Sequence, residues 1–276
     1  MKRFAPFAQV ALREMRTGFR NPWTYSFMAL FAIFMLALML IHGQGYMDGY
    51  SGMTGTMLNL MLYLLPLMTM MLGSFSLTSE KEEGSWQLLS TYPLGTSSFI
   101  AGKYVGLAVV LLVIIVFGFG VGGLVSSFVG GGLAIRTFMT LFVFSISLAL
   151  MFLAVSMVIG SLAANRWQAL VIVVTVWFFL IIAWAPLLIA FLGWLPYVWI
   201  KPAVSILTLL NPAELSRIFA VIGLGGGSIL GPEYYDWVKW VGRSSGALAY
   251  VCFVVLWIGL SVGLADLLWE RSRARD

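Results

Sequence analysis

The stretch SEKEEGSWQLLSTYPLG, from Ser79 to Gly95, interrupts a chain that is otherwise almost uniformly apolar. After Ser79 it has four charged residues in a row, 80–83, and Pro93 stands near its end. The apolar runs on both sides are long enough for helices that cross the roughly 30 Å apolar layer of a membrane, which takes about 20 residues. The stretch therefore indicates a polar connection between two membrane spans.

Composition supports a membrane protein. Hydrophobic residues make up 61% of the 276 residues and charged residues only 10%, more apolar surface than a water-soluble domain can bury. The net charge of +5 does not indicate nucleic-acid binding, because most basic residues flank apolar runs. Cys252 is the single cysteine and His42 the single histidine, so the chain has no internal disulfide and no HExxH zinc motif.

The predicted fold class is all-α: a polytopic membrane protein with six transmembrane helices. The predicted spans are Trp23–Ile41, Met53–Leu77, Gly106–Val129, Phe138–Ala163, Leu170–Leu192 and Ala247–Ala265. Eleven of the 16 basic residues fall on the side of the two termini. Since cytoplasmic loops are enriched in Lys and Arg, we expect a multi-pass protein of the cell membrane with both termini in the cytoplasm.

We divide the chain into an amphipathic cytoplasmic helix at 1–22 and a six-span permease domain at 23–276. Residues 4–20 have a helical period that separates an apolar arc from three arginines. The apolar arc consists of Phe4, Phe7, Ala8, Ala11, Leu12, Met15 and Phe19, and the opposite side of Arg13, Arg16 and Arg20. This pattern is typical of a helix at a membrane surface, serving as an anchor or also as a docking surface. Asn21-Pro22 is expected to end it.

The stretch 79–95 predicts a short cytoplasmic helix, roughly from Glu80 to Thr91. Ser79 and Glu82 have the spacing of a capping box, and acidic residues favour the first turn of a helix. The apolar residues Trp86, Leu88 and Leu89 would form a small patch beside the acidic start. Such a patch suits either a protein contact or a helix that simply turns the chain at the membrane surface.

Ser79–Gly106 resembles the cytoplasmic segment of type-2, exporter-like ABC transporter permeases. The residues that carry the resemblance are Glu80, Glu82, Glu83, Gly84, Leu88, Leu89, Pro93, Gly102 and Lys103, together with "LNPAELSRI" at Leu210–Ile218. Within the family, "STYPLG", "GKYVG" and "LNPAELSR" most resemble the permease of the transporter for nitrous-oxide-reductase maturation. The resemblance implies a coupling helix at 79–95, with Trp86 among its contacts, that docks into an ATP-binding subunit.

The same resemblance implies two ATP-binding subunits and a second copy of the permease. ATP and Mg²⁺ would be bound by the partner, with no cofactor in this chain. The sequence supports that division, because "GTSSFIAGK" at Gly95–Lys103 has six residues between its glycines, where a phosphate-binding loop has four. We therefore expect no enzymatic activity in this chain. The narrower resemblance implies that the transporter takes part in the maturation of a copper enzyme.

The region 193–246 is predicted to be external and partly helical, with Leu195–Leu210 as a re-entrant or interfacial helix. Asn211, Pro212 and Glu214 predict an N-cap, a proline at the first helical position and a capping partner, in a helix that ends at Gly223–Gly227. The resemblance implies an external cap made by Asn211, Pro212, Glu214 and Arg217. Aromatic residues follow at Tyr234, Tyr235, Trp237 and Trp240, as is typical of a membrane interface, and the first external loop could contact an extracytoplasmic partner.

Methionines and glycines leave two questions open. Met53, Met57, Met61, Met68 and Met71 share one face of the second span, which suits packing or, less simply, a path for Cu(I). The pairs Gly102/Gly106 and Gly118/Gly122 allow close helix approach, within the chain or between two copies.

Two other function classes compete with the permease. Glu82-Glu83 suggests an intramembrane protease of the prenyl-endopeptidase kind, but Gln87 stands where that motif has arginine. A passive channel or structural membrane protein is the other alternative. No Asp, Glu, Lys or Arg lies in the middle of any predicted span, which argues against an ion-coupled carrier and against a charged pore ring.

Overall fold

The computed structural model describes residues 4–41, 46–47, 49–84, 95–129, 132–242 and 244–273. These residues form helices joined by short connections, with one minimal pair of parallel strands. The helices are α1 (Phe4–Arg20), α2 (Pro22–Ile41), α3 (Gly52–Glu82), α5 (Thr96–Val129), α6 (Ile135–Leu162), α7 (Arg166–Trp177), η1 (Phe178–Ala183), α8 (Trp184–Leu192), α9 (Tyr197–Leu210), α10 (Pro212–Gly223), η2 (Gly227–Leu230), η3 (Pro232–Tyr234), α11 (Tyr235–Val241) and α12 (Ser244–Arg273). The strands β1 (Tyr46–Met47) and β2 (Gly132–Leu133) pair with each other. The all-α prediction is confirmed.

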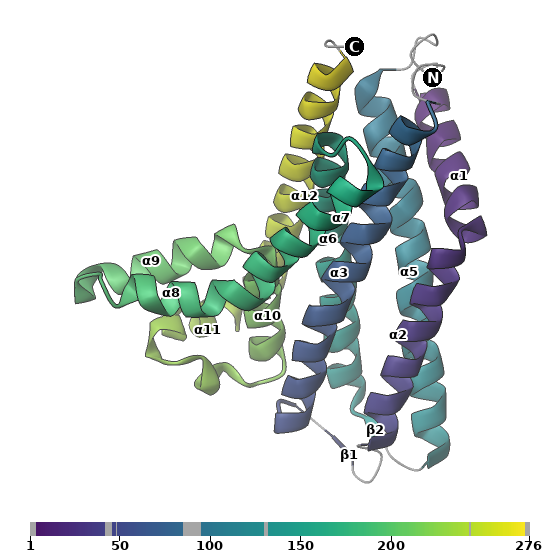
Figure 1. Ribbon diagram of the computed structural model, residues 1–276. Helices are drawn as coiled ribbons and strands as arrows, with labels where there is room; N and C mark the ends of the chain where they lie inside the picture. The colour runs from purple at the N-terminus through teal and green to yellow at the C-terminus, as the bar shows by residue number, and fades with distance from the viewer. Residues whose placement is uncertain are drawn as a thin grey trace.

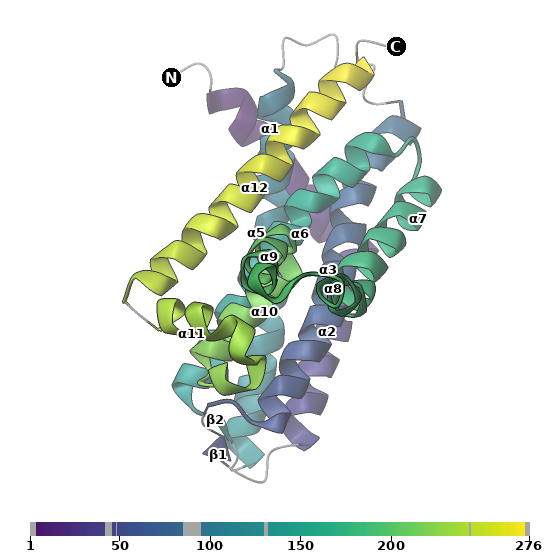
Figure 2. The same ribbon diagram turned by 90° about the vertical axis from the view of Figure 1, so that its left-hand side faces the viewer.

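The long helices run side by side as a bundle (Figure 1). The start of α1 and the end of α12 lie at one end of this bundle, the termini end, and the β1–β2 pair lies at the other (Figures 1 and 2). The segments α8, α9 and α11 project from one side. Inside the bundle, α3 packs on α6 and α7, while α1 and α2 both pack along α5.

The number of spans lies between five and seven. Five helical stretches are long and apolar enough to cross a membrane, and two bent pairs pass the same test jointly. The first pair joins α1 to α2 with a bend of 67°, and the second joins α9 to α10 with a bend of 107°. The first bend falls at Asn21-Pro22 as predicted, because proline lacks the N–H of a helix interior and restricts the preceding residue.

The predicted capping box at Ser79 is wrong. Helix α3 continues without a break to Glu82, and the Ser79 hydroxyl donates to the Ser76 carbonyl oxygen one turn earlier (3.1 Å). The helix ends at Glu82 with Glu83 as its C-cap, and Gly84 follows with a φ of +64°, which suits glycine. The rest of the predicted coupling helix, including Trp86, Leu88, Leu89 and Pro93, lies outside the described residues.

The region after α8 agrees with the sequence in most details. The Asn211 side chain caps α10 by accepting hydrogen bonds from the backbone N–H groups of Ala213 and Glu214 (2.9 and 3.4 Å), and α10 ends at Gly223. Glu214 is not the capping partner that was predicted. Its carboxylate accepts from the Arg217 guanidinium one turn later, because a full opposite charge within the same helix is a stronger partner than a backbone N–H.

Candidate functional site

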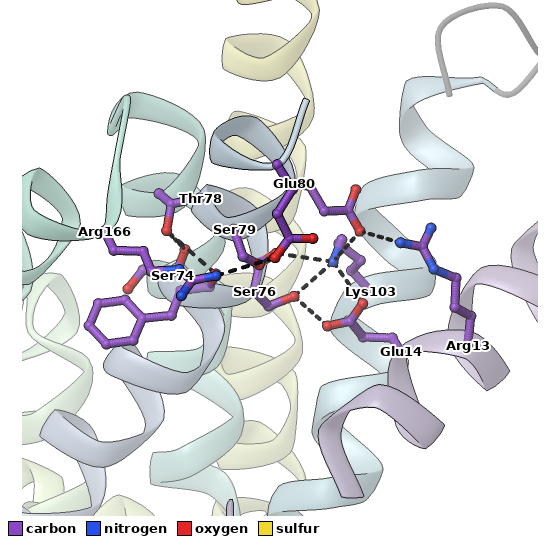
Figure 3. Close-up of polar contacts among 11 residues, drawn as sticks. Arg13, Glu14, Ser74, Ser76, Thr78, Ser79, Glu80, Lys103 and Arg166 are labelled. Carbon is purple, nitrogen blue, oxygen red and sulfur yellow. Dashed lines mark hydrogen bonds and ion pairs between the residues drawn. The ribbon is translucent and has the colours of Figure 1, made fainter. Parts of the chain in front are cut away.

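A cluster of charged side chains is buried between α1, α3 and α5 near the termini end (Figure 3). The Lys103 ammonium of α5 donates to Glu14 Oε2 of α1 at 2.7 Å and lies 2.9 Å from Glu80 Oε1 of α3. It also donates to the Ser76 hydroxyl at 2.8 Å, and that hydroxyl contacts Glu14 in turn. The side chains of Lys103, Glu14 and Glu80 are only 2%, 8% and 7% exposed. One lysine therefore joins three helices.

Two glycines allow this approach of α1 to α5. A Cβ added at Gly106 would lie 2.6 Å from the Ala11 carbonyl oxygen, and one added at Gly102 would lie 3.0 Å from that of Phe7. The backbones are therefore in contact on both sides of Lys103, which places its side chain within reach of Glu14. The Gly102/Gly106 pair serves an intramolecular helix contact, one of the two roles that the sequence left open.

The cluster is electrically neutral as a whole. Arg13 Nη2 donates to Glu80 Oε1 at 3.1 Å, so two cations, Arg13 and Lys103, face two carboxylates, Glu14 and Glu80. Arg13 is half-exposed, whereas the other three are buried. Removing one partner of a buried ion pair leaves an uncompensated charge at a cost of about 3–5 kcal/mol. The cluster thus holds the three helices in one relative position.

The other charged residues of the stretch 80–83 contact different helices. Lys81 Nζ donates to three carbonyl oxygens at the end of α6, those of Gly160, Ser161 and Ala163 (3.1, 2.8 and 2.7 Å), where the helix dipole favours a cation. The same ammonium lies 4.8 Å from the centre of the Trp269 ring on α12, a cation–π contact. Lys81 therefore connects α3 to α6 and α12.

Glu82 and Glu83 contact the start of α7. Arg166 Nε lies 3.1 Å from Glu82 Oε2 and its Nη2 lies 3.4 Å from Glu83 Oε1, and the Arg166 backbone N–H donates to Glu82 Oε1 at 2.7 Å. The three side chains are 49%, 34% and 65% exposed, so these ion pairs are weaker than the buried ones. Asn165 caps α7 by accepting from the Gln168 N–H. Residues 80–83 together connect the end of α3 to α1, α5, α6, α7 and α12.

A cavity of about 700 Å³ lies beside the cluster. Its walls come from α1 and the start of α2, from α3 and α5, and from the first turns of α7. The lining residues are Arg13, Glu14, Thr17, Gly18, Asn21, Pro22, Trp23, Phe27, Met71, Leu72, Phe75, Ser76, Ser79, Glu80, Glu83, Lys103, Leu107, Arg166, Trp167 and Leu170. The cavity is therefore charged in one part and apolar in the other.

The structure brings some predicted site residues together and separates others. Glu80, Gly102 and Lys103 lie in the buried cluster, while Glu82 and Glu83 lie at its exposed edge. Of the predicted external cap residues, Asn211 is the N-cap of α10 and Pro212, Glu214 and Arg217 lie in that helix, and none of the four lines the cavity. Asn211 there also donates to the Leu180 carbonyl oxygen of the π-helical turn η1 at 2.7 Å.

The methionine face of α3 is used in packing. Met57 and Met61 are fully buried and Met68 is 5% exposed, and the Ser145 hydroxyl of α6 lies 3.4 Å from Met61 Sδ. Among the described residues there is no group of three or more His, Cys, Asp or Glu side chains that could hold a metal ion.

Sequence reasoning missed Glu14 and Lys81. Glu14 is the single acidic residue of α1 and stands four residues after Val10 and four before Gly18, all three of them buried. This spacing of four residues, which places Glu14 on the same helix face as Val10 and Gly18, was the available signal that Glu14 is buried. Lys81 was visible only as one member of a charged run.

The chain matches the family described as ABC-2 family transporter protein over residues 8–272. Two relatives share the description "Probable ABC transporter permease protein NosY". The one from Stutzerimonas stutzeri is 27% identical over 274 residues, covering 95% of this chain and 97% of the relative. The one from Pseudomonas aeruginosa is 27% identical over 271 residues, again covering 95% and 97%. The similarity thus includes every helix that contributes to the charge cluster.

Proposed function

The chain belongs to the ABC-2 family of transporter proteins, and we propose that ATP hydrolysis in a separate ATP-binding subunit drives it through the connection between α3 and α5. It is an ABC transporter permease, similar to two proteins described as NosY, and is not itself catalytic. ATP and Mg²⁺ would bind to that partner subunit, of which we propose two copies.

The observation that carries this proposal is the set of contacts made by residues 80–83. They form the first part of the coupling helix predicted at 79–95 and stand at the end of α3, before residues 85–94, which lie outside the described residues. Glu80, Lys81 and the Glu82-Glu83 pair contact different helices. A displacement of this connection would therefore act on several helices at once, as a coupling site requires. Trp86, Leu88, Leu89 and Pro93 would form the contact with the partner.

Assembly provides the test. The affinity-tagged permease is co-expressed with its candidate ATP-binding subunit, and the amount of ATPase that co-purifies is measured. Leu88→Glu with Leu89→Glu is expected to abolish co-purification, because two buried charges would be placed in the apolar patch. Ile135→Glu is the matched control, since Ile135 is 78% exposed at the opposite end of the bundle. Equal co-purification of the ATPase with the wild type, the double variant and the Ile135→Glu control would refute the coupling site.

We propose six spans: α2, α3, α5, α6, the continuous α7–η1–α8 and α12. On this division, 1–22 forms the amphipathic cytoplasmic helix, 23–276 the permease domain and 193–246 an external region. An even number of spans is supported by the start of α1 and the end of α12 lying at the same end of the bundle (Figure 1). A green fluorescent protein fused to the C-terminus is expected to fluoresce, and a periplasmic reporter such as alkaline phosphatase to stay inactive there. The reverse pattern would contradict a cytoplasmic C-terminus.

A second copy of the permease is the proposed neighbour of α7–α8. Only 6% of the most apolar part of Arg166–Leu192 is buried within the chain, against 67% for Ile135–Leu162. In the membrane, part of the exposed surface of α7–α8 would be covered by lipid and part by a second copy of the permease. Cross-linking through a cysteine placed at Val171, in a chain with Cys252 replaced by Ser, is expected to give a dimer band in membranes. A monomer alone would count against this arrangement.

For the substrate we propose a role in maturation of a copper enzyme, nitrous-oxide reductase. The support is the name of the two relatives and the resemblance of "STYPLG", "GKYVG" and "LNPAELSR". In a host that makes the reductase, deletion of this gene is expected to leave the reductase polypeptide present but inactive, and a plasmid copy is expected to restore activity. An active reductase in the deletion strain would exclude this role without affecting the ATPase-coupling proposal. The external cap residues, Asn211, Pro212, Glu214 and Arg217, would help to close the outer mouth of the two-permease dimer, and the first external loop would meet an extracytoplasmic accessory protein.

A further inference from the structure

We propose that the cavity beside the charge cluster binds a membrane phospholipid whose headgroup carries a primary ammonium group, as phosphatidylethanolamine does. The site is made by the chain alone. It requires no ATP-binding subunit and does not rest on the proposed coupling function.

The cavity walls change from polar to apolar in the same direction. Along α3, the lining runs from Glu83, Glu80 and Ser76 at the termini end to Phe75 and Met71. At a rise of 1.5 Å per residue, the twelve steps from Met71 to Glu83 span about 18 Å. A single amphiphile with its headgroup at the termini end would match this wall along its length.

The two other walls repeat this order. On α7, Arg166 is followed by Trp167 and Leu170. On the N-terminal side, Arg13 of α1 is followed across the bend by Trp23 and Phe27 of α2. Helix α7 starts at the termini end, and α2 leads away from it (Figures 1 and 2). On all three walls the charged residues therefore precede the aromatic ones in the direction away from the termini end, as in one leaflet of a membrane.

The accessible charges of the cavity have both signs. The buried ammonium of Lys103 is occupied by Glu14 and Glu80. The groups that face the open part are Arg13, Arg166 and Glu83, with side chains 50%, 49% and 65% exposed. A guanidinium binds phosphate oxygens well, and a carboxylate accepts hydrogen bonds from an ammonium group.

This combination selects among headgroups. In a headgroup with a phosphate and an attached ammonium, the phosphate can bind the arginines and the ammonium can bind the carboxylate of Glu83. Arg166 is the cation that Glu83 has in the structure, and a phosphate that binds this guanidinium competes with Glu83 for it. An anionic glycerol headgroup then leaves Glu83 without a cation, and a choline headgroup has no N–H to donate to it. The charges of the cavity therefore favour a primary ammonium headgroup over these two.

Size and access agree with a lipid. A volume of about 700 Å³ is in the range of small-ligand sites, enough for a headgroup and the first part of the acyl chains. Two lining tryptophans, Trp23 and Trp167, are 54% and 78% exposed, so they stand at the rim of an open cavity. Tryptophan prefers the membrane interface, where the headgroup region of a bound lipid would lie.

The test is native mass spectrometry of the purified permease in detergent, after removal of lipid. Phosphatidylethanolamine, phosphatidylglycerol and phosphatidylcholine with identical acyl chains are added separately at equal concentrations. We expect one retained phosphatidylethanolamine, bound at least about fivefold more than either other lipid, because charge-assisted hydrogen bonds are roughly twice as strong as neutral ones. Preference for phosphatidylglycerol, or equal retention of all three lipids, would overturn the proposal.

Variants that fill the cavity locate the site. Thr17→Trp and Leu170→Trp add bulk from opposite walls, so one remains informative if the other fails to fold. Leu12→Trp and Val171→Trp are matched controls on the same two helices, at positions 47% and 65% exposed that do not line the cavity. We expect the folded cavity variants to lose most of the bound phosphatidylethanolamine and the controls to keep it. Undiminished binding in the folded cavity variants would place the lipid elsewhere and refute the site.

Discussion

Replacing Lys103 by Met is expected to destabilise the protein strongly, since it removes the cation that two buried carboxylates share. Glu80 keeps its contact with Arg13 at 3.1 Å. Among the described residues, Glu14 keeps only its contact with the Ser76 hydroxyl, in a side chain that is 8% exposed. One carboxylate thus becomes a buried charge without a cation, which costs about 3–5 kcal/mol.

The assay is unfolding of the purified permease in detergent, monitored by tryptophan fluorescence. Arg166→Met is the matched control, because it breaks ion pairs whose side chains are 34–65% exposed, and such pairs contribute at most about 1 kcal/mol each. The double variant Glu14→Gln with Lys103→Met removes the stranded charge and is expected to recover at least about half of the loss, which a double-mutant cycle measures.

Two results would refute this reasoning. The first is a Lys103→Met protein as stable as the wild type. The second is a double variant no more stable than Lys103→Met alone, because the loss would then not come from an uncompensated charge on Glu14.

Two further predictions concern single positions. Gly106→Ala is expected to cost about 1–3 kcal/mol by pushing α1 away from α5, whereas Gly120→Ala meets nothing within 4 Å and is expected to be neutral or slightly stabilising; equal effects in unfolding assays would contradict the close contact. Asn211→Ala is expected to cost about 1–2 kcal/mol through loss of the α10 cap, while the uncharged Asn211→Ser keeps a cap acceptor at this buried position and loses the amide donor to Leu180, and is expected to cost less. If Asn211→Ser is as damaging as Asn211→Ala, the bond to Leu180 rather than the cap stabilises this region.

The helices and several of their ends could be predicted from local sequence. Apolar runs of sufficient length identify helices in a membrane protein because an unpaired backbone group is costly there. The bend at Asn21-Pro22 and the cap at Asn211 follow from the chemistry of single residues. The end of α3 could not be predicted in the same way. A Ser-x-x-Glu pattern also occurs inside helices, and the change from apolar to charged residues at Ser79 reflects the level of the membrane surface rather than the end of the helix.

The charge cluster could be predicted only in part. Glu80 and Lys103 were chosen for their place in a family motif, without any indication that they contact each other. Glu14 is 89 positions away from Lys103 in the chain, and no local period reveals such a pair. A carboxylate on a helix with three arginines on its other side looks like surface charge, and its burial follows from the position of α5.

The need for such a cluster follows from the solvent. In a membrane, the lipid tails are as apolar as the side chains, so moving an apolar side chain from lipid to a helix interface gains little free energy. Helix association therefore depends on close packing and polar contacts. At the termini end α1 approaches α5 through glycines, and Lys103 then connects both helices to α3. Because Lys81 and Arg166 extend the same contacts to α6, α12 and α7, the end of α3 has a fixed position relative to each neighbour. A helix held in this way transmits a displacement to the bundle, whereas one held by apolar contacts alone could slide past its neighbours.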